Sequence, residues 1–91
     1  MMYDTKNRIL HTGVYETKNI TKIEHKFLVA LKGGNFVTCE ELCEKIYGKL
    51  DERHLNCIRV LKCRLRKKTK KELEIENKIG LGYRIKNLYY E

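Results

Sequence analysis

The sequence predicts a small α+β domain with three helices in the middle of the chain and short strands near both ends. Three observations favour this class: two segments begin with a helix N-cap pattern, a third repeats apolar residues at helical spacing, and a fourth alternates apolar and polar residues. The 91 residues are 42% hydrophobic and 35% charged, a globular composition with enough chain for one modest core. We therefore expect a single domain over residues 1–91.

The segment before residue 20 predicts short strands. Ile9–Leu10 and Val14–Tyr15 have the composition of extended chain, and the turn dipeptides Thr12–Gly13 and Lys18–Asn19 interrupt them. This arrangement is typical of a small hairpin or an edge sheet. Such an element either covers the core or forms the edge of a dimer.

The first helix is predicted over residues 22–32. Thr21 and Glu24 have the spacing of a capping box, in which each side chain bonds to the other residue's backbone N–H. Apolar side chains then recur at helical spacing, at Ile23, Phe27, Leu28 and Leu31. Gly33–Gly34 supplies the left-handed residue at which helices commonly end.

A second, shorter helix is predicted between Thr38 and Gly48. Thr38 and Glu41 repeat the capping spacing, and Gly48 is a typical C-terminal stop. The apolar stripe of this helix consists of Leu42, Cys43, Ile46 and Tyr47. Before it, Phe36–Val37 predicts a short β-like connector.

Most of the positive charge lies in the segment that predicts the third helix. The chain has a net charge of +8, and residues 52–72 hold nine bases and two acids. After a connector at residues 48–53, the apolar face of the helix consists of Leu55, Ile58, Leu61 and Leu65. The opposite face presents Asn56, Arg59, Val60, Cys63, Arg66 and Lys67 to solvent. A rigid basic face of this kind fits the groove of a nucleic-acid duplex.

A β-hairpin is predicted after the third helix. Apolar and charged residues alternate there, with one side of the strand formed by Leu73, Ile75, Asn77 and Ile79. Residues 80–82 form a turn and residues 83–85 a returning strand, with Tyr83 packed between the hairpin and the core. Three helices followed by such a hairpin form a winged helix-turn-helix. In that fold the third helix enters the major groove of DNA, and the hairpin lies against the adjacent minor groove or backbone.

Five short motifs follow one another between residues 20 and 85. They are Ile20-Thr21-x-x-Glu24, Val37-Thr38-x-Glu40-Glu41-Leu42, Ile46-Tyr47-Gly48, Leu65-Arg66-Lys67-Lys68 and Gly80-Leu81-Gly82-Tyr83-Arg84. With these motifs, about two-thirds of the chain resembles the OmpR/PhoB-type DNA-binding domains found at the C-terminus of bacterial response regulators. The resemblance implies sequence-specific binding to duplex DNA and regulation of transcription.

The resemblance also implies two kinds of DNA contact. The base-reading positions of the third helix correspond to Val60, Cys63 and Arg64. Arg64 would then pair with guanine, and Val60 would pack on a thymine methyl group. Phosphate contacts are predicted at Thr38, Asn56, Arg59, Arg66, Lys67, Lys78 and Arg84.

Two residues depart from the family pattern. Lys62 stands where the family usually has an apolar core residue, so either its ammonium group extends to the surface or the helix is slightly rotated. Ile79 stands where the family often has an arginine that enters the minor groove. The basic residues of the hairpin are then Lys78 and Arg84.

The resemblance implies partners besides double-stranded DNA. In the family, the loop between the second and third helices can contact RNA polymerase, and here that loop is predicted at residues 48–53. Relatives bind direct repeats as tandem pairs, so we expect a monomer or weak homodimer that binds DNA cooperatively. Because the DNA-binding module accounts for the whole chain, we expect no receiver domain.

Two other functions stay open on the residues alone. The basic helix would also suit a winged-helix module that docks an acidic protein surface, or a binder of nucleic acid without sequence preference. Preference for one DNA sequence separates these functions from the first. RNA is less favoured because the chain has no aromatic stacking surface of the RNA-binding type.

No pattern predicts catalysis, a cofactor or a metal site. The four cysteines and His54 lack C-x-x-C spacing, so we expect free thiols in a reducing compartment. Neither His25 nor His54 belongs to a recognisable nucleophile arrangement, so we expect no enzyme. No apolar run reaches the roughly 20 residues that span a bilayer, which predicts a cytoplasmic protein without membrane contact.

Overall fold

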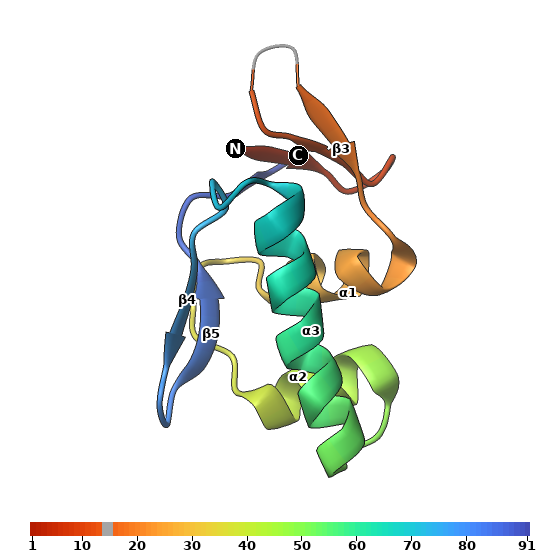
Figure 1. Cartoon of the computed structure of the whole chain (residues 1–91), viewed down its shortest axis with the longest axis vertical. Coiled ribbons are helices and arrows are strands. Elements are labelled where there is room, and N and C mark those ends of the chain that lie inside the picture. Colours follow the sequence, from red (N-terminus) through yellow and green to blue (C-terminus); the bar gives the residue numbers. More distant parts are fainter. Residues whose placement is uncertain (14–15) are drawn as a thin grey trace.

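The computed structural model describes residues 1–13 and 16–91. Over these residues it contains three helices and two small β-sheets, which confirms the predicted α+β class (Figure 1). The larger sheet lies at the C-terminal end of the third helix, and the smaller one runs alongside that helix. None of the helices in the described ranges is long and apolar enough to cross a membrane.

The larger sheet joins the two ends of the chain. Its four strands, in the order β3-β2-β1-β6, are β1 (Met2–Asp4), β2 (Ile9–His11), β3 (Thr17–Asn19) and β6 (Tyr89–Tyr90). β2 pairs antiparallel with β1 and with β3, whereas β6 pairs parallel with β1. The N- and C-terminal segments therefore lie side by side (Figure 1).

The predicted N-terminal hairpin is only part of this sheet. Ile9–Leu10 lies in β2 as expected, and Val14–Tyr15 lies outside the described residues. The prediction of a turn at Lys18–Asn19 is wrong, because Lys18 pairs with Leu10 within β3. β1 and β6 were not predicted, since strands of two or three residues are too short to show a period.

Helix α1 (Lys22–Ala30) begins at the predicted capping box. The Thr21 hydroxyl accepts the Glu24 N–H at 3.2 Å, and a Glu24 carboxylate oxygen accepts the Thr21 N–H at 3.0 Å. The helix ends two residues earlier than predicted, because Leu31 is already its C-cap. Gly33 and Gly34 have positive φ values of 106° and 77°, but they follow the C-cap Leu31, so the prediction that they end the helix is wrong.

Helix α2 (Cys39–Tyr47) has both predicted ends. At its start, the Thr38 hydroxyl accepts the Glu41 N–H at 3.2 Å. At its end, Gly48 is in the left-handed conformation with φ 70°. Cys43 is fully buried, which confirms its predicted place on the apolar face.

Helix α3 (Glu52–Lys68) begins earlier than predicted. A carboxylate oxygen of Asp51 accepts the His54 N–H at 2.8 Å, so Asp51 is the N-cap. The connector between α2 and α3 is therefore residues 48–51 rather than 48–53. The apolar period of the helix begins only at Leu55, so it does not indicate this earlier start.

The smaller sheet is the predicted hairpin, formed by β4 (Ile75–Lys78) and β5 (Gly82–Ile85). Tyr83 and Val37 exchange backbone hydrogen bonds of 2.9 and 2.8 Å, which attach the hairpin to the segment before α2. A side chain on Gly82 would meet the Val37 carbonyl oxygen at 2.0 Å, so only glycine fits there. The prediction that Ile79 continues the buried side is wrong, because β4 ends at Lys78 and Ile79 is fully exposed in the turn.

The core lies between the three helices and the two sheets. From α3 it takes Ile58, Leu61 and Leu65, all buried as predicted, while Leu55 is half-buried. Tyr83 is 2% exposed, which confirms its predicted packing role. Because the buried residues of α3 share one side, the opposite side is held rigidly toward solvent.

Candidate nucleic-acid interface

The predicted recognition face of α3 is open to solvent. Seven of the predicted contact residues are exposed on this helix: Asn56, Arg59, Val60, Cys63, Arg64, Arg66 and Lys67. Val60 is 48% exposed, although it is a large apolar side chain. α3 has no acidic residue after Glu52, so this face carries four cations and no carboxylate of its own helix.

The three predicted base-reading residues lie together. Val60, Cys63 and Arg64 line one open hollow on α3, and Arg59 and Lys67 complete it. Their spacing of three and four residues places them on adjacent turns of one helix side. The structure thus joins predicted base-reading and phosphate-binding side chains in one surface.

A second groove lies between α3, the start of α2 and the hairpin. Thr38 of the α2 cap and Arg59 of α3 line this groove with the hairpin residue Tyr83. Its other lining residues are Cys39, Glu40, Asn77, Ile79, Gly80 and Gly82. Glu40 lies in the first turn of α2, where a carboxylate offsets the positive end of the helix. The start of α2 therefore attracts a phosphate less strongly than the Thr38 cap alone would.

The two predicted phosphate contacts in the hairpin already have partners. Arg84 Nε donates to a Glu76 carboxylate oxygen at 2.9 Å, and the ammonium groups of Lys86 and Lys78 lie 3.3 and 3.4 Å from the same carboxylate. The Arg84 guanidinium also lies 4.7 Å from the centre of the Phe36 ring. The hydrogen bond from Arg84, with that from Lys86, lowers the pKa of Glu76. The hairpin cations are thus partly neutralised within the protein.

Lys62 lies at the border of the core. It is half-buried, and its Nζ is 5.4 Å from the centre of the buried Tyr83 ring. Burial raises the pKa of the Tyr83 hydroxyl, so the ring stays neutral beneath the ammonium group. This position agrees with the expectation that the Lys62 stem follows apolar surface while its charge stays near solvent.

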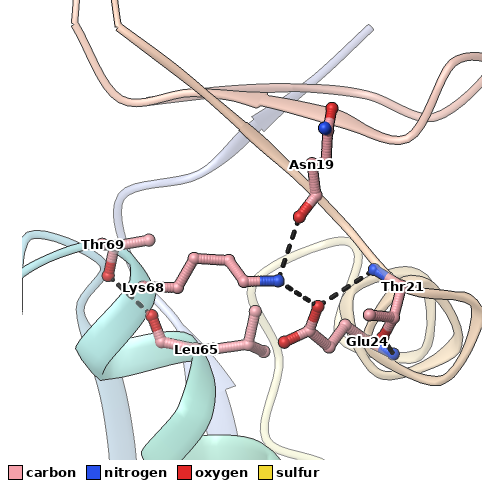
Figure 2. Close-up of polar contacts among 6 residues, drawn as sticks. All are labelled: Asn19, Thr21, Glu24, Leu65, Lys68 and Thr69. Atoms are coloured by element: carbon pink, nitrogen blue, oxygen red, sulfur yellow. Dashed lines mark hydrogen bonds and ion pairs between the residues drawn. The ribbon is translucent and has the colours of Figure 1, made fainter.

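Lys68 belongs to the basic segment but not to its exposed face. Figure 2 shows its Nζ between the α1 capping box and β3. The Nζ lies 2.5 Å from a Glu24 carboxylate oxygen and donates to the Asn19 carbonyl oxygen at 2.9 Å. Glu24 is only 3% exposed. Burial alone would raise the pKa of Glu24, but the Lys68 ammonium and the Thr21 N–H hold it below its usual value. Lys68 therefore fastens α3 to α1 and is not available to an external anion.

Two lysines without a predicted role lie beside the predicted recognition face. Lys70 and Lys71 follow the last turn of α3 and line a hollow with Cys63, Arg66 and Lys67. Both are exposed. The periodic pattern of α3 ends before them, so only their place in the basic run would have indicated them.

The histidines and cysteines show local structural contacts. His25 Nδ1 lies 2.6 Å from the hydroxyl of Tyr3, and burial raises the pKa of that hydroxyl to about 12. His54 Nδ1 lies 2.7 Å from the Asp51 carboxylate. All four cysteines are free thiols, as expected, and Cys63 alone among these four is exposed. Within the described ranges, no three His, Cys, Asp or Glu side chains are grouped as metal ligands would be.

A comparison with protein-family models finds no match, and a comparison with curated proteins finds none either.

Proposed function

We propose that this chain is a winged helix-turn-helix protein that binds duplex DNA sequence-specifically and regulates transcription. The observation that carries the proposal is the exposed face of α3, which holds four cations and no acid on a helix whose opposite side is buried. The helix has 17 residues, a length of about 25 Å, and the major groove accepts an α-helix. The hairpin beside α3 and the OmpR/PhoB-like motifs support the same function.

The side chains of this face divide between reading bases and holding phosphates. Arg64 offers a bidentate donor pair to guanine, and the exposed methyl groups of Val60 fit a thymine methyl, with Cys63 between them on the helix. Arg59, on one side of these residues, would contact phosphates and fix the position of α3 without reading sequence. The other phosphate contacts that we propose outside the hairpin are Thr38, Asn56, Arg66 and Lys67.

The hairpin contributes less electrostatic attraction than α3 in this proposal. Lys78 and Arg84 keep a role at the DNA backbone, but Glu76 offsets part of their charge. Ile79, in the turn after Lys78, is fully exposed and carries no charge. We therefore expect α3 to account for most of the affinity.

In this proposal, regulation of transcription requires contacts with RNA polymerase and with a second copy of the chain, in addition to contacts with one DNA site. The connector at residues 48–51 exposes Leu50 to 48% and is the surface we propose for contact with RNA polymerase. Cooperative binding to tandem sites is the proposed mode of assembly. Both are tested by footprinting on a two-site operator, with and without polymerase.

The proposal is tested by selecting bound duplexes from a random-sequence pool and then measuring affinity by fluorescence anisotropy at about 150 mM salt. We expect one enriched motif, bound about a thousandfold or more tightly than a scrambled duplex. A variant with Arg59→Gln and Arg64→Gln should lose this binding, whereas Lys6→Gln with Lys26→Gln, an equal charge change on other elements, should keep it. Equal affinity for all duplexes would contradict the proposal and favour a nonspecific binder. Tighter binding to an acidic polypeptide than to any duplex would favour a protein-docking module.

A further inference from the structure

The end of α3 forms a basic hollow that is separate from the hairpin groove. This hollow, of about 400 Å³, is lined by Arg66, Lys67, Lys70, Lys71 and Cys63. Its lining thus contains four cations and no acid. Among residues 1–13 and 16–91, no carboxylate lies within ion-pair distance of any of these four cations. Lys68, by contrast, is bonded to Glu24. Arg66 and Lys71 also line a neighbouring hollow with Glu74 and Glu76, but neither cation forms an ion pair with these carboxylates in the described residues.

Two of these cations, Lys70 and Lys71, have a backbone conformation that is unfavourable for lysine. The Lys71 N–H donates to the Arg66 carbonyl at 2.7 Å and the Lys70 N–H to the Lys67 carbonyl at 3.1 Å, the bond pattern of a Schellman motif. Lys70 and Lys71 have φ values of 53° and 66°, in the left-handed region that favours glycine or asparagine. Lysine is thus present at two positions where its side chain disfavours the required backbone.

The helix end is fixed from the inside as well. The buried Thr69 hydroxyl donates to the Leu65 carbonyl at 2.9 Å, a bond drawn in Figure 2, and accepts the Leu73 N–H at 3.4 Å. These bonds hold the turn that carries Lys70 and Lys71. The four cations therefore stand on a defined backbone rather than on a loose tail.

The basic hollow adjoins the base-reading residues directly. Cys63 and Lys67 line both this hollow and the hollow that contains Val60 and Arg64. When a helix lies in the major groove, the sugar-phosphate backbone runs along each side of the bases that it reads. A phosphate strand beside the bases at Val60 and Arg64 would therefore pass over the basic hollow.

We propose that the basic hollow binds consecutive phosphates of the DNA strand that borders the major groove, with Lys70 and Lys71 as phosphate-binding residues. This inference rests on the proposed function and deepens it. Several cations around an open hollow suit a polyanion with regularly spaced charges, and lysine ammonium groups bind phosphates as point charges. The site adds affinity for every sequence and leaves the choice of bases to α3.

The first test compares the parent chain with the double variant Lys70→Asn and Lys71→Asn. Asparagine tolerates the left-handed backbone, so the variant keeps the fold while it loses two charges. We expect the double variant to bind both the selected and the scrambled duplex at least about tenfold more weakly than the parent. The slope of log affinity against log salt concentration should be smaller in magnitude by about two. The matched control, Lys6→Asn with Lys26→Asn, removes the same charge from other elements and should keep the salt dependence of the parent.

The outcomes separate this inference from the proposed function. If the parent binds its selected duplex and the double variant binds equally well with the same salt dependence, the hollow does not hold phosphates, while the proposed function stands. If the parent binds no duplex, both fail. A different result is that polyglutamate binds the parent more tightly than DNA does, and that the double variant, but not the control variant, no longer binds polyglutamate. The hollow is then a site for acidic protein and the inference is wrong.

A second test locates the phosphates. Single phosphates of the selected duplex are replaced one at a time by neutral methylphosphonate linkages, and affinities are measured for the parent and the double variant. At a linkage contacted by Lys70 or Lys71, the neutral substitution should lower the affinity of the parent. It should barely lower the affinity of the double variant below that for the unmodified duplex, because the lysine that would contact this phosphate is already absent. These linkages should border the bases read by α3. Equal losses for both proteins at every linkage would overturn the assignment of Lys70 and Lys71.

Discussion

The inner and the outer side of the end of α3 carry neighbouring lysines with different surroundings. On the inner side, Lys68 Nζ bonds to the buried Glu24 carboxylate and to the Asn19 carbonyl oxygen (Figure 2). On the outer side, Lys67 is exposed and lines two hollows. One lysine joins two parts of the fold and the other is available to a ligand. A run of basic residues in a sequence therefore overstates the charge that a partner meets.

The hairpin extends this contrast. Arg84 has the same formal charge as Arg66, but it donates to Glu76 across the hairpin and lies over the Phe36 ring. Arg66 lies in the basic hollow. The internal partners of a cation therefore decide whether it contributes to the fold or stays exposed to solvent.

The largest expected effect is the difference in stability between variants of the two neighbouring lysines, Lys68 and Lys67. Lys68→Met leaves the Glu24 carboxylate buried without its cation, so we expect a loss of about 3 kcal/mol in the free energy of unfolding. Lys67→Met should change it by less than about 0.5 kcal/mol, because that side chain is exposed. Urea unfolding followed by circular dichroism measures both. Similar losses for the two variants would contradict the distinction between the inner and the outer side.

On the outer side, the next effect distinguishes base readers from phosphate contacts. Arg64→Ala should relax specificity by about 1–3 kcal/mol at one base pair, because it would remove the bidentate contact to guanine that we propose for this side chain. Lys67→Ala should instead weaken all sequences similarly. Anisotropy with single-base variants of the selected duplex measures the difference. If Arg64→Ala lost equal affinity on the selected and the scrambled duplex, Arg64 would not read bases.

The inner side also predicts a pH dependence. The pKa of Glu24 is lowered in the folded protein, so its contribution to stability is present above the usual glutamate value near 4.5 and is lost as the pH falls through the lowered pKa. The stability difference between the parent and Glu24→Gln should therefore shrink below about pH 4.5. Glutamine keeps the capping-box bond, which makes it the matched variant. A difference that is constant between pH 7 and pH 3 would show that the ion pair adds nothing to stability.

Features with a local cause could be predicted from the sequence. The Thr21–Glu24 capping box and the Gly48 stop depend on residues within a few positions of each other. The two faces of α3 follow from its 3.6-residue period, which places Ile58 and Leu65 inward and Arg59 outward. These rules gave the class of the fold and the exposed face.

Features that join residues distant in the sequence could not be predicted from it. The pairing of β1 with β6 links the two ends of the chain, and the ion pair between Glu24 and Lys68 links residues 44 positions apart. No period in the sequence indicates either one. The pair formed by Glu76 and Arg84 was accessible in principle, because the register of the hairpin places them opposite each other once the turn is known.

The smallest expected effect concerns the backbone of Lys70, where a charged side chain lowers the stability of the fold. Lys70 has a left-handed backbone in the C′ position of α3, where glycine is usual, so Lys70→Gly should raise the free energy of unfolding by about 0.5–1 kcal/mol. The same variant should bind the selected duplex several-fold more weakly, because it would lose the phosphate contact that we propose for Lys70. Urea unfolding and anisotropy on one preparation measure both. A lysine with only a structural role would not give opposite changes in stability and affinity, whereas a phosphate-binding lysine on a strained backbone gives both.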